Sequence, residues 1–336
     1  MEAIYFEAPG HVTGRDIDPP VLSRPSAALV RPVAVATCDL DTAMLRGTAP
    51  HPPEPFPFGH EAIAEVIDVG DEVDHFRPGQ RVIVPFQLSC GTCQRCATGR
   101  TGRCSTLGGL PMYGLGALGG DQAGMLTDLV EVPYADAMLI AAPAGPPVTA
   151  LASLSDNIPD AWRTVAPPLR SAPGADVLVV GGGAVSIGLY AVALARALGA
   201  GDVFYLDDNG DRLELAHRLG ATPLEGGQHP PRCPITVDAS GTPEGLQLAI
   251  ARTDIDGTCT SAAIYFEPVE FPLLGMYTNG IRFVTGRPHV RTLLPDIIDL
   301  VVAGTFDPQV VPASHVAWED ALDALADPDD KLVIYR

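Results

Sequence analysis

The sequence predicts an α/β protein in which a parallel, doubly wound sheet is joined to a β-rich part. Strand and helix patterns alternate from residue 176 to residue 285, which is typical of a parallel sheet wrapped by helices. The N-terminal third instead carries short apolar runs separated by turn residues, which indicates strands. The chain has 336 residues, 46% hydrophobic and 18% charged, so about two globular domains of roughly 150 residues are expected.

In the N-terminal third, residues 62–69 alternate apolar and acidic side chains, as a half-buried strand does. Residues 81–84 form a short apolar run, and residues 124–133 are a further strand candidate. Residues 49–57 hold five prolines and are expected to be irregular. The prolines within 143–147 mark an expected boundary.

The middle of the chain is where strands and helices alternate. Its expected strands are 176–180, 203–207, 235–238, 257–262 and 281–285, and its expected helices are 186–198, 211–219 and 243–252. Helices at 295–303 and 317–326 and a last strand at 332–335 follow. Residues 177–195 carry no charge, but three consecutive glycines interrupt them, so we expect a strand, a turn and a helix rather than a membrane span.

Charge and cysteine content narrow the class of protein. The formal net charge of −20 argues against nucleic acid and anionic membranes as main partners. The first residues do not resemble a secretory signal, so a cytoplasmic location is expected. Seven cysteines, an odd number, argue against a disulfide framework.

Four of the cysteines lie within fifteen residues, with the spacing C-x2-C-x2-C-x7-C: Cys90, Cys93, Cys96 and Cys104. Four thiolates at such spacing can enclose one zinc ion in a closed, structural site. An iron–sulfur cluster or four unligated thiols are the alternatives, but the spacing is not that of a ferredoxin.

A glycine-rich turn follows the predicted strand at 176–180 and opens a helix, which is the context of a dinucleotide-binding turn. The candidate residues are Gly181, Gly182, Gly183, Val185, Ser186 and Ile187. The fit to G-x-G-x-x-G is imperfect, because Ser186 or Val185 replaces a glycine in either possible frame. A turn without a ligand is the alternative.

Two carboxylates follow the next strand, and they favour NAD over NADP. Asp207 can accept hydrogen bonds from the adenosine ribose and repel a 2′-phosphate. Asp208 is a second candidate, although it can equally cap the following helix. Arg287 and His289 follow the last strand of this part and could contact a cofactor phosphate or lie on the surface.

Together these residues resemble the zinc-dependent medium-chain dehydrogenases, typified by alcohol, polyol and formaldehyde dehydrogenases. The resemblance rests on Gly59-His60-Glu61, on residues 69–82, on the cysteine loop and on the glycine turn. It implies a GroES-like β-barrel catalytic domain at 1–152, a Rossmann NAD-binding domain at 153–287 and a return to the catalytic domain at 288–336. It also implies two zinc ions per chain, one catalytic and one structural, and a homodimer or homotetramer.

The resemblance also implies a catalytic zinc bound by Cys38 and His60. The family's third ligand is a cysteine or a carboxylate, and no cysteine lies between Cys104 and Cys233. The stretch 154–160 is similar to the formaldehyde dehydrogenase branch, which places Asp156 as the third ligand, with Asp160 as the alternative.

Two further carboxylates have implied roles. Asp41 resembles the residue that orients the histidine, and Glu61 would lie behind the ligands or bind the metal transiently. One position departs from the family, which usually has Ser or Thr where this chain has Leu40. A leucine cannot pass a proton, so Thr37, Asp39, Thr42 or a water molecule would have to do so.

The function that this resemblance implies is zinc-dependent, NAD-linked interconversion of a small alcohol and an aldehyde or ketone. A specialised biosynthetic reductase with an altered proton relay is the second interpretation, which Leu40 would suit. A non-catalytic dinucleotide-binding protein is the third.

Overall fold

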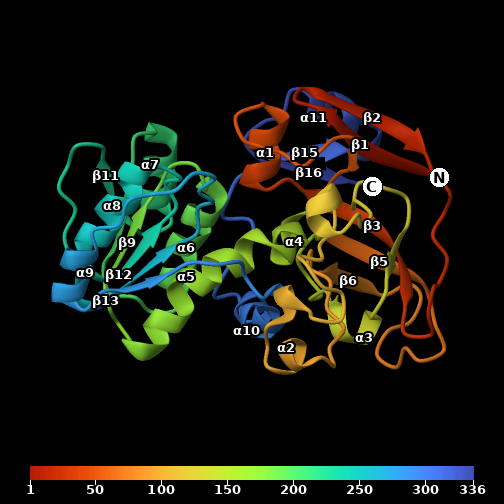
Figure 1. Ribbon diagram of the computed structural model, residues 1–336, viewed down its shortest axis with the longest axis horizontal. Coiled ribbons are helices and arrows are strands. Elements are labelled where there is room, and N and C mark those ends of the chain that lie inside the picture. Colours follow the sequence, from red (N-terminus) through yellow and green to blue (C-terminus); the bar gives the residue numbers. More distant parts are fainter. The chain divides into compact units, whose positions relative to one another are not determined.

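The computed structural model describes all 336 residues, and their contacts divide the chain into two units (Figure 1). Unit 1 contains Met1–Pro159, Pro288–Asp299 and Pro312–Arg336, and unit 2 contains Asp160–Arg287 and Leu300–Val311. The expected domain limits differ from this division in two places. The first limit lies at residue 159 instead of 152, and residues 300–311 belong to unit 2 rather than to the C-terminal return.

Unit 1 is built on a seven-stranded sheet of order β15-β16-β3-β5-β6-β8, in which β7 pairs with β3. Its strands are β3 (Ala28–Ala36), β5 (Glu61–Val69), β6 (Arg81–Val84), β7 (Val130–Val132), β8 (Ile140–Ala141), β15 (Ser314–Ala317) and β16 (Leu332–Tyr335). The first four residues of β5 are all buried, and burial alternates only from Glu65 onward. The start of β5 is therefore covered on both faces.

A second, three-stranded sheet of order β2-β1-β4 completes the β-structure of unit 1. It contains β1 (Glu2–Ala8), β2 (His11–Asp16) and β4 (Phe56–Pro57). The helices that begin in this unit are short apart from two: α1 (Asp39–Leu45), α2 (Gln94–Ala97), α3 (Ala135–Met138), α4 (Val148–Leu151), α5 (Asn157–Ser171), α10 (Val290–Val302) and α11 (Ala321–Ala326).

Unit 2 is a six-stranded, entirely parallel sheet of order β11-β10-β9-β12-β13-β14. Its strands are β9 (Val177–Val180), β10 (Val203–Asp207), β11 (Thr222–Glu225), β12 (Cys233–Asp238), β13 (Thr253–Ser261) and β14 (Arg282–Val284). Its helices are α6 (Val185–Ala197), α7 (Gly210–Arg218), α8 (Pro243–Arg252) and α9 (Leu273–Asn279). This order places the switch point between β9 and β12, where a doubly wound sheet binds ligands.

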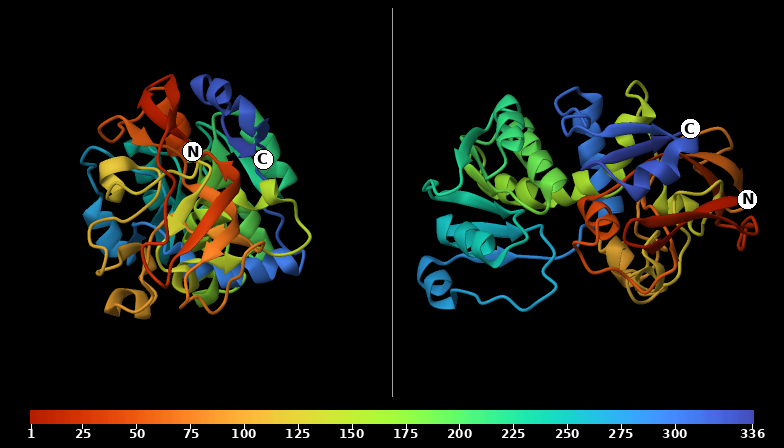
Figure 2. Two further views of the ribbon diagram at one scale, coloured as in Figure 1. Left: turned by 90° about the vertical axis from the view of Figure 1, so that its right-hand side faces the viewer. Right: turned by 90° about the horizontal axis from the view of Figure 1, so that it is seen from above.

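The helices of unit 2 cover both faces of its sheet. Right-handed crossovers place α6 and α7 on one face and α8 and α9 on the other, which the right-hand view of Figure 2 shows. All four residues of β9 are buried, as expected for the central strand of such a sheet. Cys233 and Cys259 lie in the same core and are fully buried.

The expected strand at 124–133 is wrong for its first six residues, since only Val130–Val132 form a strand. The backbone N–H groups of Met125 and Leu126 donate to Gly59 O and Phe58 O instead. A Cβ on Gly124 would lie 2.2 Å from Phe58 O, so the two backbones touch where they cross. This crossing supports the residues that precede His60.

Both C-terminal helices begin elsewhere than expected. α10 begins at Val290, five residues before Pro295, which lies inside it. Its start is fixed from outside, because Gln87 donates to Pro288 O at 2.9 Å and accepts from Val290 N at 3.4 Å. The expected helix at 317–326 opens with the end of β15 and a 3-10 turn, so α11 covers only its second half.

The uncharged stretch 177–195 divides into β9, the glycine turn and most of α6. None of the helices combines the length and the apolar character that crossing a membrane requires.

Candidate active site

Cys38 lies where β3 ends and α1 begins, and its side chain caps the helix. The Cys38 Sγ accepts the N–H of Asp41 at 3.3 Å, and Asp41 Oδ2 accepts the N–H of Cys38 at 3.1 Å. This reciprocal pair is a capping box with a thiol in place of a hydroxyl. It fixes the thiol and the Asp41 carboxylate beside each other.

His60 is placed by the glycine before it. Gly59 has a φ of +86°, and a Cβ there would lie 2.9 Å from Leu126 Cγ, so a larger residue would clash. The His60 ring is buried, with its centroid 5.5 Å from that of Phe86. Its Nδ1 lies 3.5 Å from Asp41 Oδ2, as in a carboxylate–histidine pair that orients a metal ligand.

Asp156 lies between a 3-10 turn (Ala152–Ser155) and the start of α5. The preceding Ser155 ties this turn to β5, since its hydroxyl donates to Ala62 O at 2.8 Å and accepts from Ala62 N at 3.1 Å. Asp156 is thereby held next to His60, with its Oδ2 3.5 Å from His60 Nε2.

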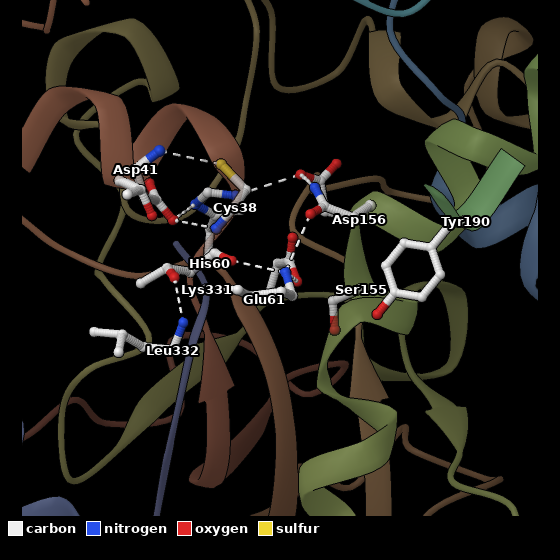
Figure 3. Close-up of polar contacts among 12 residues, drawn as sticks. Cys38, Asp41, His60, Glu61, Ser155, Asp156, Tyr190, Lys331 and Leu332 are labelled. Atoms are coloured by element: carbon white, nitrogen blue, oxygen red, sulfur yellow. Dashed lines mark hydrogen bonds and ion pairs between the residues drawn. The ribbon is translucent and has the colours of Figure 1, made fainter. Parts of the chain in front are cut away.

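The structure brings together Cys38, His60 and Asp156, the three residues that the resemblance names as ligands (Figure 3). One donor atom from each lies within 4.8 Å of the other two. Cys38 and His60 are buried, whereas the Asp156 side chain is 14% exposed. The three donors come from segments far apart in the sequence.

The electrostatics of this group are those of a site that needs a cation. Burial, followed by the charge of Asp41, raises the pKa of the Cys38 thiol to about 12. Burial alone would lower the pKa of His60, but Asp41 and Cys38 raise it well above its usual value. Asp41 Oδ1 is buried without a hydrogen-bond partner. A thiolate, an imidazole and a carboxylate suit zinc, and three protein ligands leave one coordination position open.

The other residues singled out around this site have separate contacts. Glu61 is fully buried at the start of β5, and burial followed by Asp156 raises its pKa to about 7, against the effect of Lys331. The Thr42 hydroxyl donates to Asp330 O, and the Thr37 hydroxyl accepts the N–H of Leu332. Leu40 lies on α1 between them and carries no polar atom.

The four-cysteine loop also closes on itself. Its four Sγ atoms lie within 4.8 Å of one another, and the N–H groups of Cys93 and Cys96 donate to Cys90 Sγ and Cys93 Sγ. Hydrogen bonds from Ser105 and Cys96 lower the pKa of Cys93 to about 4. Four such thiols without an open position fit a structural zinc ion.

We expect Cys96→Ser to remove one zinc ion per chain and to lower the melting temperature by several degrees. The reason is that a closed structural site contributes its binding free energy to folding. Elemental analysis and calorimetry measure the two effects. Cys233→Ala, in the core of unit 2, is the matched control, because it should lower stability without any change in zinc. Loss of zinc in the control would contradict the assignment.

The glycine turn between β9 and α6 passes close to the backbone after β12. Gly183 N donates to Ser240 O at 2.7 Å, and a Cβ on Gly182, whose φ is +147°, would lie 2.6 Å from the same oxygen. α6 begins at Val185 without a side-chain cap, and Ser186 is buried in its first turn. An uncapped N-terminus of a thirteen-residue helix suits a pyrophosphate.

Asp207 lies at the end of β10 beside this turn. Its Oδ1 accepts the N–H of Asn209 at 2.9 Å, and its Oδ2 accepts the hydroxyl of Tyr205 at 2.9 Å. Arg212 Nη1 lies 3.7 Å from Oδ2 and donates to Gly182 O at 3.1 Å. A Cβ on Gly181 would lie 2.5 Å from both Asp207 Oδ2 and the Tyr205 hydroxyl. The carboxylate is therefore held rigidly under the glycine turn.

Several candidates have other places in the structure. Asp160, the alternative third ligand, forms an ion pair with Arg163 and is not part of the group around Cys38. Asp208 is exposed, and Asn209 is the residue that caps α7. His289 Nδ1 accepts the N–H of Gly102, which lies in the cysteine loop.

Sequence reasoning missed three residues that the structure places at these sites: Lys331, Tyr205 and Arg212. Lys331 could have been singled out from the sequence, because it is the only lysine of the chain. Tyr205 lies two positions before Asp207 on the same strand, so both side chains point to one face. Arg212 lies in the first turn of α7 and had no distinguishing pattern.

Comparison with known proteins gives a match over residues 24–143 to the alcohol dehydrogenase GroES-like domain. A "Probable zinc-binding alcohol dehydrogenase" of Mycobacterium tuberculosis is 29% identical over 335 residues, which cover 97% of this chain and 85% of the relative. A medium chain reductase/dehydrogenase of an Acremonium species is 31% identical over 228 residues, which cover 67% of this chain and 76% of the relative.

Two further similarities are to a formaldehyde dehydrogenase and to a solved structure. A glutathione-independent formaldehyde dehydrogenase of Pseudomonas aeruginosa is 34% identical over 231 residues, which cover 65% of this chain and 56% of that relative. The solved structure of an alcohol dehydrogenase from Thermus sp. ATN1 superposes with a TM-score of 0.89 at 26% identity and covers 100% of this chain and 99% of that one.

Proposed function

The chain belongs to the medium-chain reductase/dehydrogenase family, and on that premise we propose that it interconverts an alcohol and an aldehyde or ketone with NAD at a zinc site. The resemblance inferred from the motifs is confirmed at the family level, and so is the expected fold class of a GroES-like domain with a Rossmann domain. The observation that carries the proposal is the convergence of Cys38, His60 and Asp156 within 4.8 Å.

Each residue of the group has a proposed part in binding the metal. Cys38, His60 and Asp156 would hold zinc, and Asp41 would orient His60 through its Nδ1. Zinc bound by three protein ligands supplies an open position and a Lewis acid that lowers the pKa of an alcohol or polarises a carbonyl. The cysteine loop would hold the second, structural zinc of the chain.

The residues of unit 2 would bind the nicotinamide coenzyme. The first turn of α6, from Val185 to Ile187, faces the switch point of the sheet and would receive the pyrophosphate. Asp207 would accept the ribose hydroxyls, and its negative charge supports NAD over NADP. Catalysis further requires that a proton leave the alcohol, and Leu40 leaves Thr37 or Thr42 as the nearest hydroxyls along the chain.

We also propose a homo-oligomer in which the open edge of the unit 2 sheet is covered. β14 pairs only with β13, and α9 beside it buries none of its residues. Its Leu273, Leu274 and Tyr277 are 68%, 77% and 85% exposed, which is unusual for apolar side chains that lie together. Sedimentation equilibrium measures the number of chains.

The proposed function is tested by zinc analysis and coenzyme reduction on the same preparation. We expect two zinc ions per chain and formation of NADH from NAD with at least one class of small alcohol, polyol or hydroxymethyl adduct. Removal of the more labile zinc by a chelator should abolish the reaction, and added zinc should restore it. A protein that binds a single zinc ion per chain, at the cysteine loop, would refute the proposal. That result would indicate a non-catalytic dinucleotide-binding protein.

A further inference from the structure

Lys331 is the only lysine among the 21 lysine and arginine residues of the chain, and it is buried. Its side chain is 3% exposed, and the residue directly precedes β16 in unit 1. A lysine is almost never this deeply buried unless it is paired, because its ammonium is strongly hydrated. The one lysine ammonium of the protein therefore has a specific set of partners.

Those partners are the chain neighbours of the three proposed ligands. Lys331 Nζ donates to Thr37 O at 2.8 Å and to Asn157 Oδ1 at 3.2 Å, and it lies 3.5 Å from Glu61 Oε2. Thr37 precedes Cys38, Glu61 follows His60, and Asn157 follows Asp156. One cation thus contacts each of the three segments that carry a ligand.

The backbone around Lys331 is fixed on the same segment. The N–H of Leu332 donates to the Thr37 hydroxyl at 2.9 Å, and the N–H of Thr37 donates to Leu332 O at 3.0 Å. β16 also pairs antiparallel with β3, with Val333 opposite Ala36. The ammonium is consequently held at one place relative to Cys38, and Figure 3 shows Lys331 and Glu61 side by side beneath His60.

We propose that Lys331 is a positioning residue for the metal site, which holds the three ligand-bearing segments together and serves as the counter-ion of Glu61. This inference rests on the proposed function, because it assigns a role toward the zinc that Cys38, His60 and Asp156 would hold. An ammonium has three N–H donors, and acceptors of three kinds lie around it: a carbonyl, an amide oxygen and a carboxylate. A guanidinium presents its donors in a rigid planar fork, so it does not reproduce three contacts made by one nitrogen atom, although arginine serves at all 20 other cationic positions.

Positioning and simple electrostatics predict opposite effects when the ammonium is removed. Removing a positive charge close to a divalent cation would by itself strengthen zinc binding. Loss of the common contact to Thr37, Glu61 and Asn157 would instead loosen the ligand set and weaken zinc binding, by about 10- to 100-fold as for other residues that orient ligands.

The test measures zinc affinity of each site by chelator competition in the full-length wild type and in Lys331→Met. We expect the site of Cys38 to lose about 10- to 100-fold in affinity, while the four-cysteine site is unchanged and serves as the internal reference. In the cobalt-substituted protein, the visible bands that report the thiolate and the coordination number should change as well. Unchanged or tighter zinc binding with an unchanged cobalt spectrum would overturn the inference.

Two further variants keep the test decisive. Lys331→Arg retains the charge but not the three contacts, so it should lose affinity too, and wild-type affinity in this variant would overturn the positioning role. If Lys331→Met does not fold, the double variant Lys331→Met with Glu61→Gln removes both members of the buried pair. Its Cys38 site should bind zinc more weakly than that of the wild type.

The matched control is Arg46→Met, which removes the contacts of Arg46 to Pro328 O and Asp330 in the segment before Lys331. Arg46→Met should leave the zinc affinity of the Cys38 site unchanged. An equal loss of affinity in Arg46→Met would overturn the inference, because the effect would then come from disturbing the segment before Lys331 and not from the ammonium. Failure of the proposed function has a different result, because the wild type would then hold only the four-cysteine zinc.

Discussion

Asp156→Ala is expected to lower the zinc content from two ions per chain to about one and to reduce kcat/KM by about a thousandfold or more. Two protein donors, Cys38 and His60, hold zinc far less tightly than three. A Lewis acid contributes several kcal/mol to the stabilisation of the transition state, and about 4 kcal/mol corresponds to a thousandfold. Elemental analysis and steady-state kinetics on the same preparation measure both effects.

Asp160→Ala is the matched control for this prediction. Asp160 has the same side chain four positions later and forms an ion pair with Arg163 instead of joining the ligand group. Its replacement should cost some stability and leave the zinc count at two. Zinc loss in Asp160→Ala with retention in Asp156→Ala would reverse the assignment of the third ligand. Asp156→Cys replaces the carboxylate by a thiolate, which is also a zinc donor, and should keep two zinc ions.

The parts of the fold that could be predicted are those whose signals are local. The four-cysteine spacing lies within fifteen residues, and the strand–glycine–helix pattern at 176–198 lies within about twenty. In both cases the residues that meet in space are also close along the chain. The structure accordingly closes the cysteine loop and forms β9, the glycine turn and α6 in direct succession.

The elements that were predicted wrongly depend on partners distant in the sequence. Residues 124–129 have the composition of a strand, but they cross the chain at Phe58 and Gly59 and make only an isolated antiparallel bridge to β1, between Thr127 and Ala3. α10 begins at Val290 because Gln87, some 200 residues earlier, binds the carbonyl of Pro288 and the N–H of Val290. Neither Pro295 nor the composition of 124–133 carries information about these contacts.

The candidate site divides in the same way. Cys38 and Asp41 form a local cap, so their adjacency follows from a short stretch of sequence, whereas only the resemblance to a family indicated that His60 lies beside them. The contact of Asp156 with His60 depends on Ser155 and Ala62, which are 93 positions apart. Lys331 reaches Asn157 across 174 positions, and no pattern around it shows that its ammonium is turned inward.

The second large effect is expected at the coenzyme site. Asp207→Ala should weaken NADH binding by about 10- to 100-fold, because a hydrogen bond to a charged group contributes about 1.5–3 kcal/mol. The same change removes the charge that would repel a 2′-phosphate and leaves Arg212, which lies 3.7 Å from Asp207, free to pair with one. NADPH should therefore bind more tightly to Asp207→Ala than to the wild type. Fluorescence titration with both coenzymes measures the two affinities.

Asp208→Ala and Tyr205→Phe separate the contributions within this pocket. Asp208 is exposed and adjacent, so its replacement should leave the ratio of NADH to NADPH affinity unchanged. Tyr205→Phe keeps the carboxylate but removes the hydroxyl that holds it at 2.9 Å, and it should weaken NADH binding by less than about tenfold. A change of coenzyme preference in Asp208→Ala, with none in Asp207→Ala, would show that Asp208 and not Asp207 discriminates between the two coenzymes. The rigid Asp207, held by Tyr205 and Asn209, would then have a structural role at the end of β10.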